Sequence, residues 1–308
     1  MAALIAVVVV YGIQLLRSAF NTRLRDSEGI AAVTGAPVLA EFPVSGRRND
    51  PRLREAANYA RAGVLFNSGF PQRVIMITSP VQGEGKSVIS ASLAENFARY
   101  GYRTLLIDAD LRSPSIVERF EIVGTIAQDN TTAAWLDAPD LDRRFSSVSL
   151  GEGNRLHVLP QTQPVANASE VLGRRFGAAL DALQDFDVVV IDTPPVLAVA
   201  DALMIAPYCT GIVMVVDLKK GNRRDMVAAS NALRSTGVPL VGTVLNRSRQ
   251  GSSGGARMVV RTTSVRPVPK WHVRSSRLPA GSTMTRPCVR PDRVHDGLQP
   301  VIPVDGSD

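Results

Sequence analysis

The sequence predicts an α/β fold in which a mostly parallel β-sheet carries helices on both faces. Five short apolar runs, rich in β-branched residues, recur along the chain and leave room for a helix between them. Their apolar character is almost continuous, which is typical of strands buried on both faces. The five expected strands are 73–78, 103–108, 188–192, 211–216 and 239–246.

Helices are expected between these strands. Ile89, Leu93 and Phe97 follow the first strand at four-residue spacing, and a second helical pattern covers 223–235. Ligands of parallel sheets bind beyond the carboxyl ends of the strands. Polar residues at those ends are therefore the first candidates for a functional site.

The residues before the sheet predict a membrane anchor. The first sixteen residues are uncharged and strongly apolar. As a helix they would span about 24 Å, short of the ~30 Å hydrocarbon core. Arg17, Arg23 and Arg25 follow, and they favour a cytoplasmic location for the residues downstream. We predict a transmembrane helix over 1–20, truncated at its start. The alternative, a secretory signal peptide, lacks a preceding basic residue and a clear cleavage site.

Composition divides the rest of the chain. Residues 21–50 are expected to be a juxtamembrane segment and linker, 51–249 the folded domain, and 250–308 a disordered basic tail. From Arg249 onward ten Arg or Lys and four Asp supply six of the seven net positive charges. The net positive charge of the chain therefore belongs almost entirely to the tail, and no nucleic-acid partner is expected. Two cysteines and three lone histidines do not suggest a zinc cluster or a disulfide framework, and Cys209 is expected to be a small buried residue.

A glycine-rich loop follows the first strand and precedes a helix. The segment Gly83-Glu84-Gly85-Lys86-Ser87 fits a phosphate-binding P-loop, although Pro80 stands where the strict pattern has glycine. Backbone N–H groups of such a loop converge on phosphate oxygens at a helix N-terminus. We expect Lys86 to reach the β- and γ-phosphates and the Ser87 hydroxyl to bind Mg²⁺. The candidate nucleotide-binding residues here are Gly83, Glu84, Gly85, Lys86, Ser87 and Val88.

Carboxylates lie at the ends of two further strands. Asp108 and Asp110 follow the second strand, and Asp192 ends the third. Such oxygens suit a Mg²⁺ ion that is bound mainly through water and phosphate. The three patterns together predict a P-loop NTPase site for ATP and Mg²⁺, with Ser87, Asp110 and Asp192 as metal ligands. Asn246, at the end of the last strand, is expected either to offer its amide to adenine or to form a turn.

These motifs resemble those of the bacterial tyrosine kinases (BY-kinases) of capsule and exopolysaccharide export. LLIDADLRSP resembles their Walker A′ motif and FDVVVIDTPP their Walker B motif, and VADA and GTVLNR also follow the family. The apolar N-terminal run and TGAPVLAEFP are similar to the second transmembrane helix and exit segment of the chain-length-determinant (polysaccharide co-polymerase) domain that is often fused to the kinase. The resemblance covers roughly residues 1–249.

The resemblance implies a protein-tyrosine kinase that regulates polysaccharide synthesis and export. It implies a single-pass protein of the inner (plasma) membrane with a cytoplasmic kinase domain. Its implied partners are protein tyrosine substrates, polysaccharide export and polymerisation proteins, and further copies of itself in a homo-oligomer. Lys86, Asp108, Asp110 and Asp192 are then the catalytic candidates, with Asp108 activating the acceptor hydroxyl and Asp110 supporting the metal.

The chain also departs from the family pattern. The oligomerisation motif E-x-x-R-x-x-R appears as Glu55, Asn58 and Arg61, and the tail contains no tyrosine. Such a tail is either a membrane-binding segment or the product of a shifted reading frame. Two rival functions stay open: a nucleotide switch resembling the septum-placement and plasmid-partition ATPases, and an ATP-binding scaffold of polysaccharide export without kinase activity. The switch ATPases carry a second lysine early in the P-loop, whereas 78–82 has none, which favours the kinase.

Overall fold

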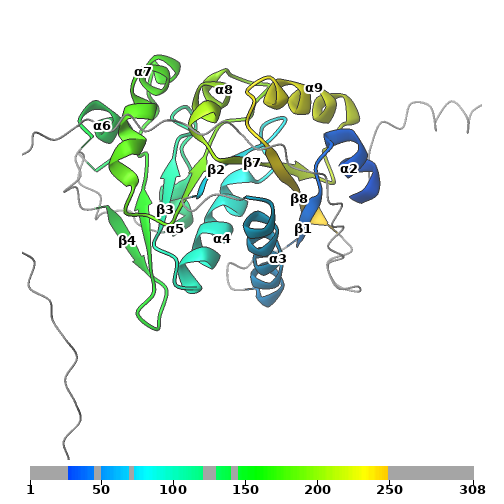
Figure 1. The fold of residues 1–308 in the computed structure, drawn as a ribbon, viewed down its shortest axis with the longest axis horizontal. Helices are drawn as coiled ribbons and strands as arrows, with labels where there is room; N and C mark the ends of the chain where they lie inside the picture. The colour runs from blue at the N-terminus through cyan, green and yellow to red at the C-terminus, as the bar shows by residue number, and fades with distance from the viewer. Residues whose placement is uncertain (1–26, 45–49, 69–72, 121–129, 140–144, 249–308) are drawn as a thin grey trace, which may run out of the picture. The chain divides into compact units, whose positions relative to one another are not determined.

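The computed structural model of the protein describes residues 27–44, 50–68, 73–120, 130–139 and 145–248 (Figure 1). The transmembrane helix predicted over 1–20 and the basic tail predicted over 250–308 lie outside these residues. Within the described ranges, no helix combines the length and the apolar character needed to cross a membrane.

An eight-stranded sheet forms the centre of the described fold. The strands are β1 (Val38–Pro43), β2 (Arg73–Thr78), β3 (Thr104–Asp108), β4 (Ser146–Ser149), β5 (Arg155–Leu159), β6 (Val188–Asp192), β7 (Gly211–Asp217) and β8 (Leu240–Ser248). They lie in the order β1-β8-β7-β2-β6-β3-β5-β4. Neighbouring strands are parallel except for the antiparallel pair β4 and β5. The predicted mostly parallel sheet is confirmed.

Helices cover both faces of this sheet, as the sequence predicts (Figure 1). Val64 and Phe97 lie in one hydrophobic core, whereas Phe176 and Leu233 lie in another. The helices are α2 (Ser27–Thr34), α3 (Pro51–Asn67), α4 (Lys86–Arg99), α5 (Ile116–Phe120), α6 (Thr132–Asp137), α7 (Ala168–Leu180), α8 (Asp201–Ile205) and α9 (Arg223–Arg234), with the 3₁₀ turns η1 (Asp181–Leu183) and η2 (Ala206–Tyr208). The first core therefore lies under α3 and α4, and the second under α7 and α9.

Three of these helices, α3, α6 and α9, begin with side-chain caps, whereas α4 does not. The carboxylate of Asp50 accepts the N–H of Arg52 at 2.9 Å at the start of α3, and Asn222 caps α9 through the N–H of Arg224 at 3.0 Å. At the start of α4 stands Gly85, in a left-handed conformation and without a side-chain cap. The first N–H groups of α4 therefore bond no capping side chain, and N–H groups at a helix N-terminus can bind an anion.

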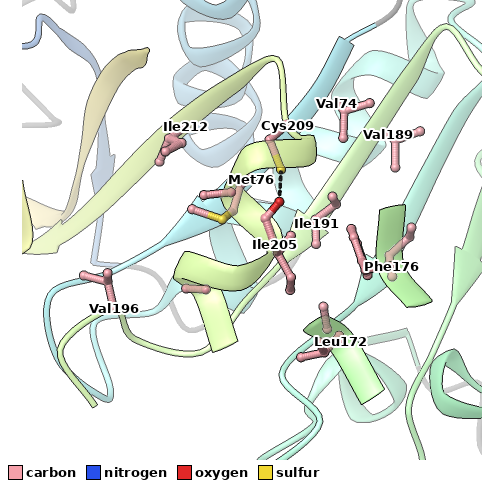
Figure 2. Close-up of a cluster of buried hydrophobic side chains, with 14 of the residues drawn as sticks. Val74, Met76, Leu172, Phe176, Val189, Ile191, Val196, Ile205, Cys209 and Ile212 are labelled. Carbon is pink, nitrogen blue, oxygen red and sulfur yellow. Dashed lines mark hydrogen bonds between the residues drawn. The ribbon is translucent and has the colours of Figure 1, made fainter. Parts of the chain in front are cut away.

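Cys209 lies in the core beneath α7 and α9, which confirms the sequence expectation. Figure 2 shows it among Val74, Met76 and Ile212, with its sulfur 3.5 Å from the carbonyl oxygen of Ile205. Burial raises the pKa of the Cys209 thiol well above its ordinary value. The residue therefore behaves as a small apolar side chain.

The strand β1 extends the folded unit beyond the predicted domain boundary at residue 51. It lies within the segment 21–50 that the sequence assigns to a juxtamembrane region and linker, and it pairs in parallel with β8. Leu39 and Phe42 of β1 are buried, and α2 packs against α9. The strands β4 and β5 also stand outside the five that the sequence predicts. These three strands lack a continuous apolar run: β1 ends in proline, β4 has three serines and one valine, and Arg155 and His157 interrupt β5.

Leu39 occupies a space that two glycines leave open. An added methyl group would overlap Leu39 at Gly242 of β8, and at Gly63 of α3 it would stand 2.8 Å from Leu39 Cδ2. We expect Gly242→Ala to lower the free energy of unfolding by about 1–3 kcal/mol through overpacking. The double variant Leu39→Ala/Gly242→Ala should lose less unfolding free energy than the two single variants lose together.

Chemical denaturation of the four proteins measures this coupling. Gly173→Ala on α7 is the control, because its methyl would meet the flexible Met204 side chain at 3.3 Å. If the losses of unfolding free energy in the two single variants added up to that of the double variant, the packing of Leu39 against Gly242 would be contradicted.

Candidate active site

The strand register brings the predicted carboxylates to one edge of the sheet. Asp192 of β6 pairs with Ile77 of β2 on one side and with Asp108 of β3 on the other. The P-loop begins directly after β2 and leads into α4 at Lys86. The P-loop, Asp108 and Asp192 therefore meet at the carboxyl ends of three adjacent strands, where parallel sheets bind ligands.

The backbone of the P-loop has the conformation of an anion-binding loop. Gly83 and Gly85 have φ angles of 81° and 87°, which favour glycine. At Gly85 a methyl group would also collide with the side-chain amide of Asn246. Ser87 and Val88 follow in the first turn of α4, and both are half-buried. N–H groups in such a loop and helix start form a positive end that attracts phosphate.

Lys86 lies against the carboxylates at the strand ends. Its Nζ donates to Asp110 Oδ2 at 2.7 Å, and both side chains are largely buried. Asp108 Oδ2 accepts two backbone N–H groups at 3.1 Å, those of residues 115 and 116. Asp192 Oδ1 accepts the hydroxyl of Ser90 at 2.9 Å. Four of the predicted site residues are thus together in one buried cluster.

The electrostatics of this cluster follow from its burial. Burial and the charge of Asp192 raise the pKa of Asp108 well above its ordinary value. Burial also raises the pKa of Asp192, although Lys86 opposes this shift. Burial lowers the pKa of Lys86, but Asp192 and Asp110 raise it more, so that it ends above its ordinary value. The lysine is therefore a firmly protonated group near Asp108 and Asp192, whose carboxylates bind a proton more tightly than exposed aspartates do.

A buried carboxylate oxygen of Asp192 fits a divalent cation. Asp108 Oδ1 and Asp192 Oδ2 have no hydrogen-bond partner among the described residues. Buried polar atoms without partners are rare, and oxygen donors of this kind are the ligands that Mg²⁺ takes. The donor set of Ser87, Asp110 and Asp192 is consistent with that ion, held together with phosphate oxygens and water.

Asn246 contacts the P-loop in this structure. Its Nδ2 donates to the carbonyl oxygen of Glu84 at 2.8 Å, and its Oδ1 accepts the N–H of Arg247 at 2.9 Å. The residue lies within β8 and is buried, so it does not form a turn. A contact with adenine stays a prediction.

Two ion pairs that the sequence analysis did not single out hold the strand-end loops. Arg112, in the segment that resembles Walker A′, donates through Nε to the fully buried Asp201 at 2.9 Å. Arg247 pairs with the fully buried Asp217 at the end of β7. A charged residue at a strand end is a weak sequence signal, because the same pattern also fits a solvated turn.

The residues that match the oligomerisation motif bond within this chain. Arg61 Nε donates to Asn96 Oδ1 at 2.8 Å, and Asn96 Nδ2 donates to Asn58 Oδ1 at 2.9 Å. The guanidinium of Arg61 also stacks over the ring of Tyr100, 3.7 Å from its centroid. These contacts join α3 to α4.

Comparison with known proteins gives a consistent picture. The family model described as the CobQ/CobB/MinD/ParA nucleotide binding domain matches residues 75–273. The chain is 34% identical over 212 residues to the tyrosine-protein kinase CpsD of Streptococcus agalactiae, which covers 67% of this chain and 89% of the relative. It is 34% identical over 202 residues to the tyrosine-protein kinase YwqD of Bacillus subtilis, which covers 64% of this chain and 83% of the relative.

Solved structures agree with these relatives. The kinase domain of the Escherichia coli tyrosine kinase ETK is similar with a TM-score of 0.63 and 25% identity, covering 75% of this chain and 97% of that one. The chimerical protein CapA2B2 is similar with a TM-score of 0.62 and 29% identity, covering 72% and 99%. The predicted nucleotide-binding P-loop fold is thereby confirmed.

Glu84 gives the site a testable dependence on pH. Its buried carboxylate accepts the N–H of Val81 at 3.2 Å and that of Asp217 at 3.5 Å. Burial raises the pKa of Glu84 from 4.5 to about 7, and the nearby charge of Asp217 adds to this shift. Because the folded-state pKa is raised, the stabilisation is fully present below about pH 4.5 and is lost as the pH rises through 7.

We therefore expect Glu84→Gln to remove one part of the pH dependence of stability. Between pH 5 and pH 8 the wild type should lose about 2 kcal/mol more unfolding free energy than the variant, whose side chain stays neutral. Denaturant titrations at both pH values measure the difference. Glu170→Gln, at an exposed position on α7, is the matched control. Equal pH profiles for wild type and Glu84→Gln would show that Glu84 is not held protonated.

Proposed function

This chain belongs to the bacterial tyrosine-protein kinases, and on that premise we propose that it transfers the γ-phosphoryl group of Mg·ATP to tyrosine hydroxyls of proteins. The observation that carries this proposal is the convergence of Lys86, Asp108, Asp110 and Asp192 beside an uncapped helix start. Phosphoryl transfer depends mostly on positioning and charge neutralisation, which these groups supply without a covalent nucleophile.

Each residue has a role in this proposal. The N–H groups of Gly83, Glu84 and Gly85 and the ammonium of Lys86 hold the phosphate oxygens, with Val88 in the first helical turn behind them. Ser87, Asp110 and Asp192 would hold Mg²⁺, which neutralises phosphate charge when it is bound. Asn246 is proposed to face the adenine side of the nucleotide.

Asp108 is proposed as the proton acceptor. As the tyrosine oxygen bonds to the γ-phosphorus and the bond to the leaving ADP oxygen breaks, the hydroxyl proton passes to Asp108 Oδ1. Two observations support this role. Oδ1 has no hydrogen-bond partner among the described residues, and the raised pKa of Asp108 gives its carboxylate a higher proton affinity than an exposed aspartate has.

We further propose that the kinase regulates capsule or exopolysaccharide synthesis and export at the inner membrane. Its support is the apolar N-terminal run, followed by the segment TGAPVLAEFP, which is similar to the exit segment of the chain-length-determinant domain. The proposed partners are protein tyrosine substrates, membrane proteins of polysaccharide polymerisation and export, and further copies of this chain.

The full chain with γ-labelled ATP, Mg²⁺ and a tyrosine-containing protein acceptor tests the proposal. We expect label on acceptor tyrosine, with little free phosphate. Label that appears only as free phosphate would favour the switch ATPase, and bound ATP without any turnover would favour the scaffold. The full chain is the sample because β1 and α2 belong to the folded unit.

Two substitutions test the residue roles. Lys86→Met should lower the rate of transfer by roughly 10²-fold or more, since it removes a charge aimed at the transferring phosphate. Asp192→Asn should raise the Mg²⁺ concentration that half-maximal activity requires, because it weakens a proposed ligand. Asp185→Asn, at an exposed position in an ion pair with Arg103 (3.6 Å), is the matched control. An unchanged Mg²⁺ titration in Asp192→Asn would place the metal elsewhere.

A further inference from the structure

The end of β8 bonds two successive carbonyl groups of the P-loop. Asn246 Nδ2 donates to the carbonyl oxygen of Glu84 at 2.8 Å, and Arg247 Nη1 donates to that of Gly83 at 3.3 Å. Both donors approach from the strand β8, which is far from the loop in sequence but adjacent to β7 in the sheet. Both residues lie just before Ser248, the last residue of β8.

These two bonds fix the orientation of two peptide planes. In a trans peptide the C=O and the N–H of the same plane point in opposite directions. A donor that holds the Gly83 carbonyl therefore turns the N–H of Glu84 to the other side, and a donor on the Glu84 carbonyl does the same for the N–H of Gly85. Consecutive N–H groups that face one side form a nest for an anion.

Arg247 is itself held in place by a buried charge. Asp217 at the end of β7 is fully buried and pairs with Arg247 Nη1, the same nitrogen that donates to Gly83. The Asp217 Oδ1 atom accepts the N–H of Lys219 at 2.8 Å, which orients the carboxylate. Arg247 has a φ of 55°, an uncommon conformation for a residue other than glycine. The buried carboxylate of Asp217 and the uncommon backbone conformation of Arg247 together indicate that the guanidinium is held in one specific position.

We propose that Asn246 and Arg247, with Asp217 behind Arg247, are positioning residues that turn the N–H groups of Glu84 and Gly85 toward the β-phosphate of the nucleotide. This inference rests on the proposed function, because it requires a nucleotide in the P-loop. The residues act through the backbone of the loop and do not touch the phosphate themselves. Their loss should therefore weaken the binding of nucleotides that carry a β-phosphate.

The test compares Mg·ADP with AMP in calorimetric titrations of the full-length protein. We expect Arg247→Gln to weaken ADP binding about tenfold and to change AMP binding less than twofold, and Asn246→Asp to weaken ADP binding by at least the same factor. In transfer assays the KM for ATP should rise by a similar factor, with kcat within threefold of the wild type. Arg234→Gln is the matched control, because Arg234 also donates to a backbone carbonyl, that of Thr34 at 3.0 Å, but on the surface of α9.

A second variant distinguishes a loss of ADP binding from a loss of folding. Arg247→Gln leaves Asp217 buried without its ion-pair partner, whereas Asp217→Asn/Arg247→Gln removes both charges. The double variant should fold with a melting temperature near that of the wild type and still bind ADP about tenfold more weakly. ADP affinities within twofold of the wild type, or equal losses for ADP and AMP, would overturn the inference.

The wild type, titrated with ADP and also assayed for phosphoryl transfer, tests the proposed function separately. ADP binding without phosphoryl transfer would remove the kinase proposal and leave the inference intact. No binding of ADP by the wild type would remove both.

Discussion

The burial of several carboxylates around one ammonium group is the constraint on which this site depends. Asp108 and Asp192 are fully buried and adjacent through strand register, and Lys86 bonds Asp110 beside them. Like charges a few ångströms apart in a medium of low dielectric repel strongly, so the cluster calls for more positive charge than Lys86 supplies. The same arrangement that lowers stability therefore favours the binding of a cation beside the cluster.

The sequence predicted the parts of the fold that have a strong local pattern. β2, β3, β6, β7 and β8 are continuous apolar runs, and each was recognised from its own residues. β1 was not, because its stability comes from distant residues: Leu39 fills a space bounded by Gly63 and Gly242. No local pattern in a segment with glycine and proline on either side indicates that such a space exists. Hydrophobic periodicity predicts single helices and strands, but it does not predict contacts between residues far apart in sequence.

The same division holds at the active site. Spacing and strand order placed Lys86, Asp108 and Asp192 at one sheet edge. The strand register has both aspartates there, and the ion pair with Asp110 has Lys86 beside them. Spacing does not say where a side chain points, and Asn246 illustrates this. Asn246 was expected to offer its amide to adenine or to form a turn. It forms no turn, and its amide bonds the carbonyl of Glu84 and the N–H of Arg247, while the contact with adenine stays a prediction. The direction of a side chain at the end of a strand depends on its neighbours in the sheet, here β7 and the P-loop.

The strand β8 links the strand β1 to the P-loop. On one side it pairs with β1, where the hydroxyl of Ser248 donates to Glu41 at 2.6 Å. At its carboxyl end Asn246 and Arg247 bond the P-loop. If β1 were removed, β8 would become the edge of the sheet, and edge strands open more readily than central ones. The segment 27–44 is therefore part of the scaffold that orients the nucleotide loop. A kinase domain defined from residue 51 would lack a strand on which its own active site rests.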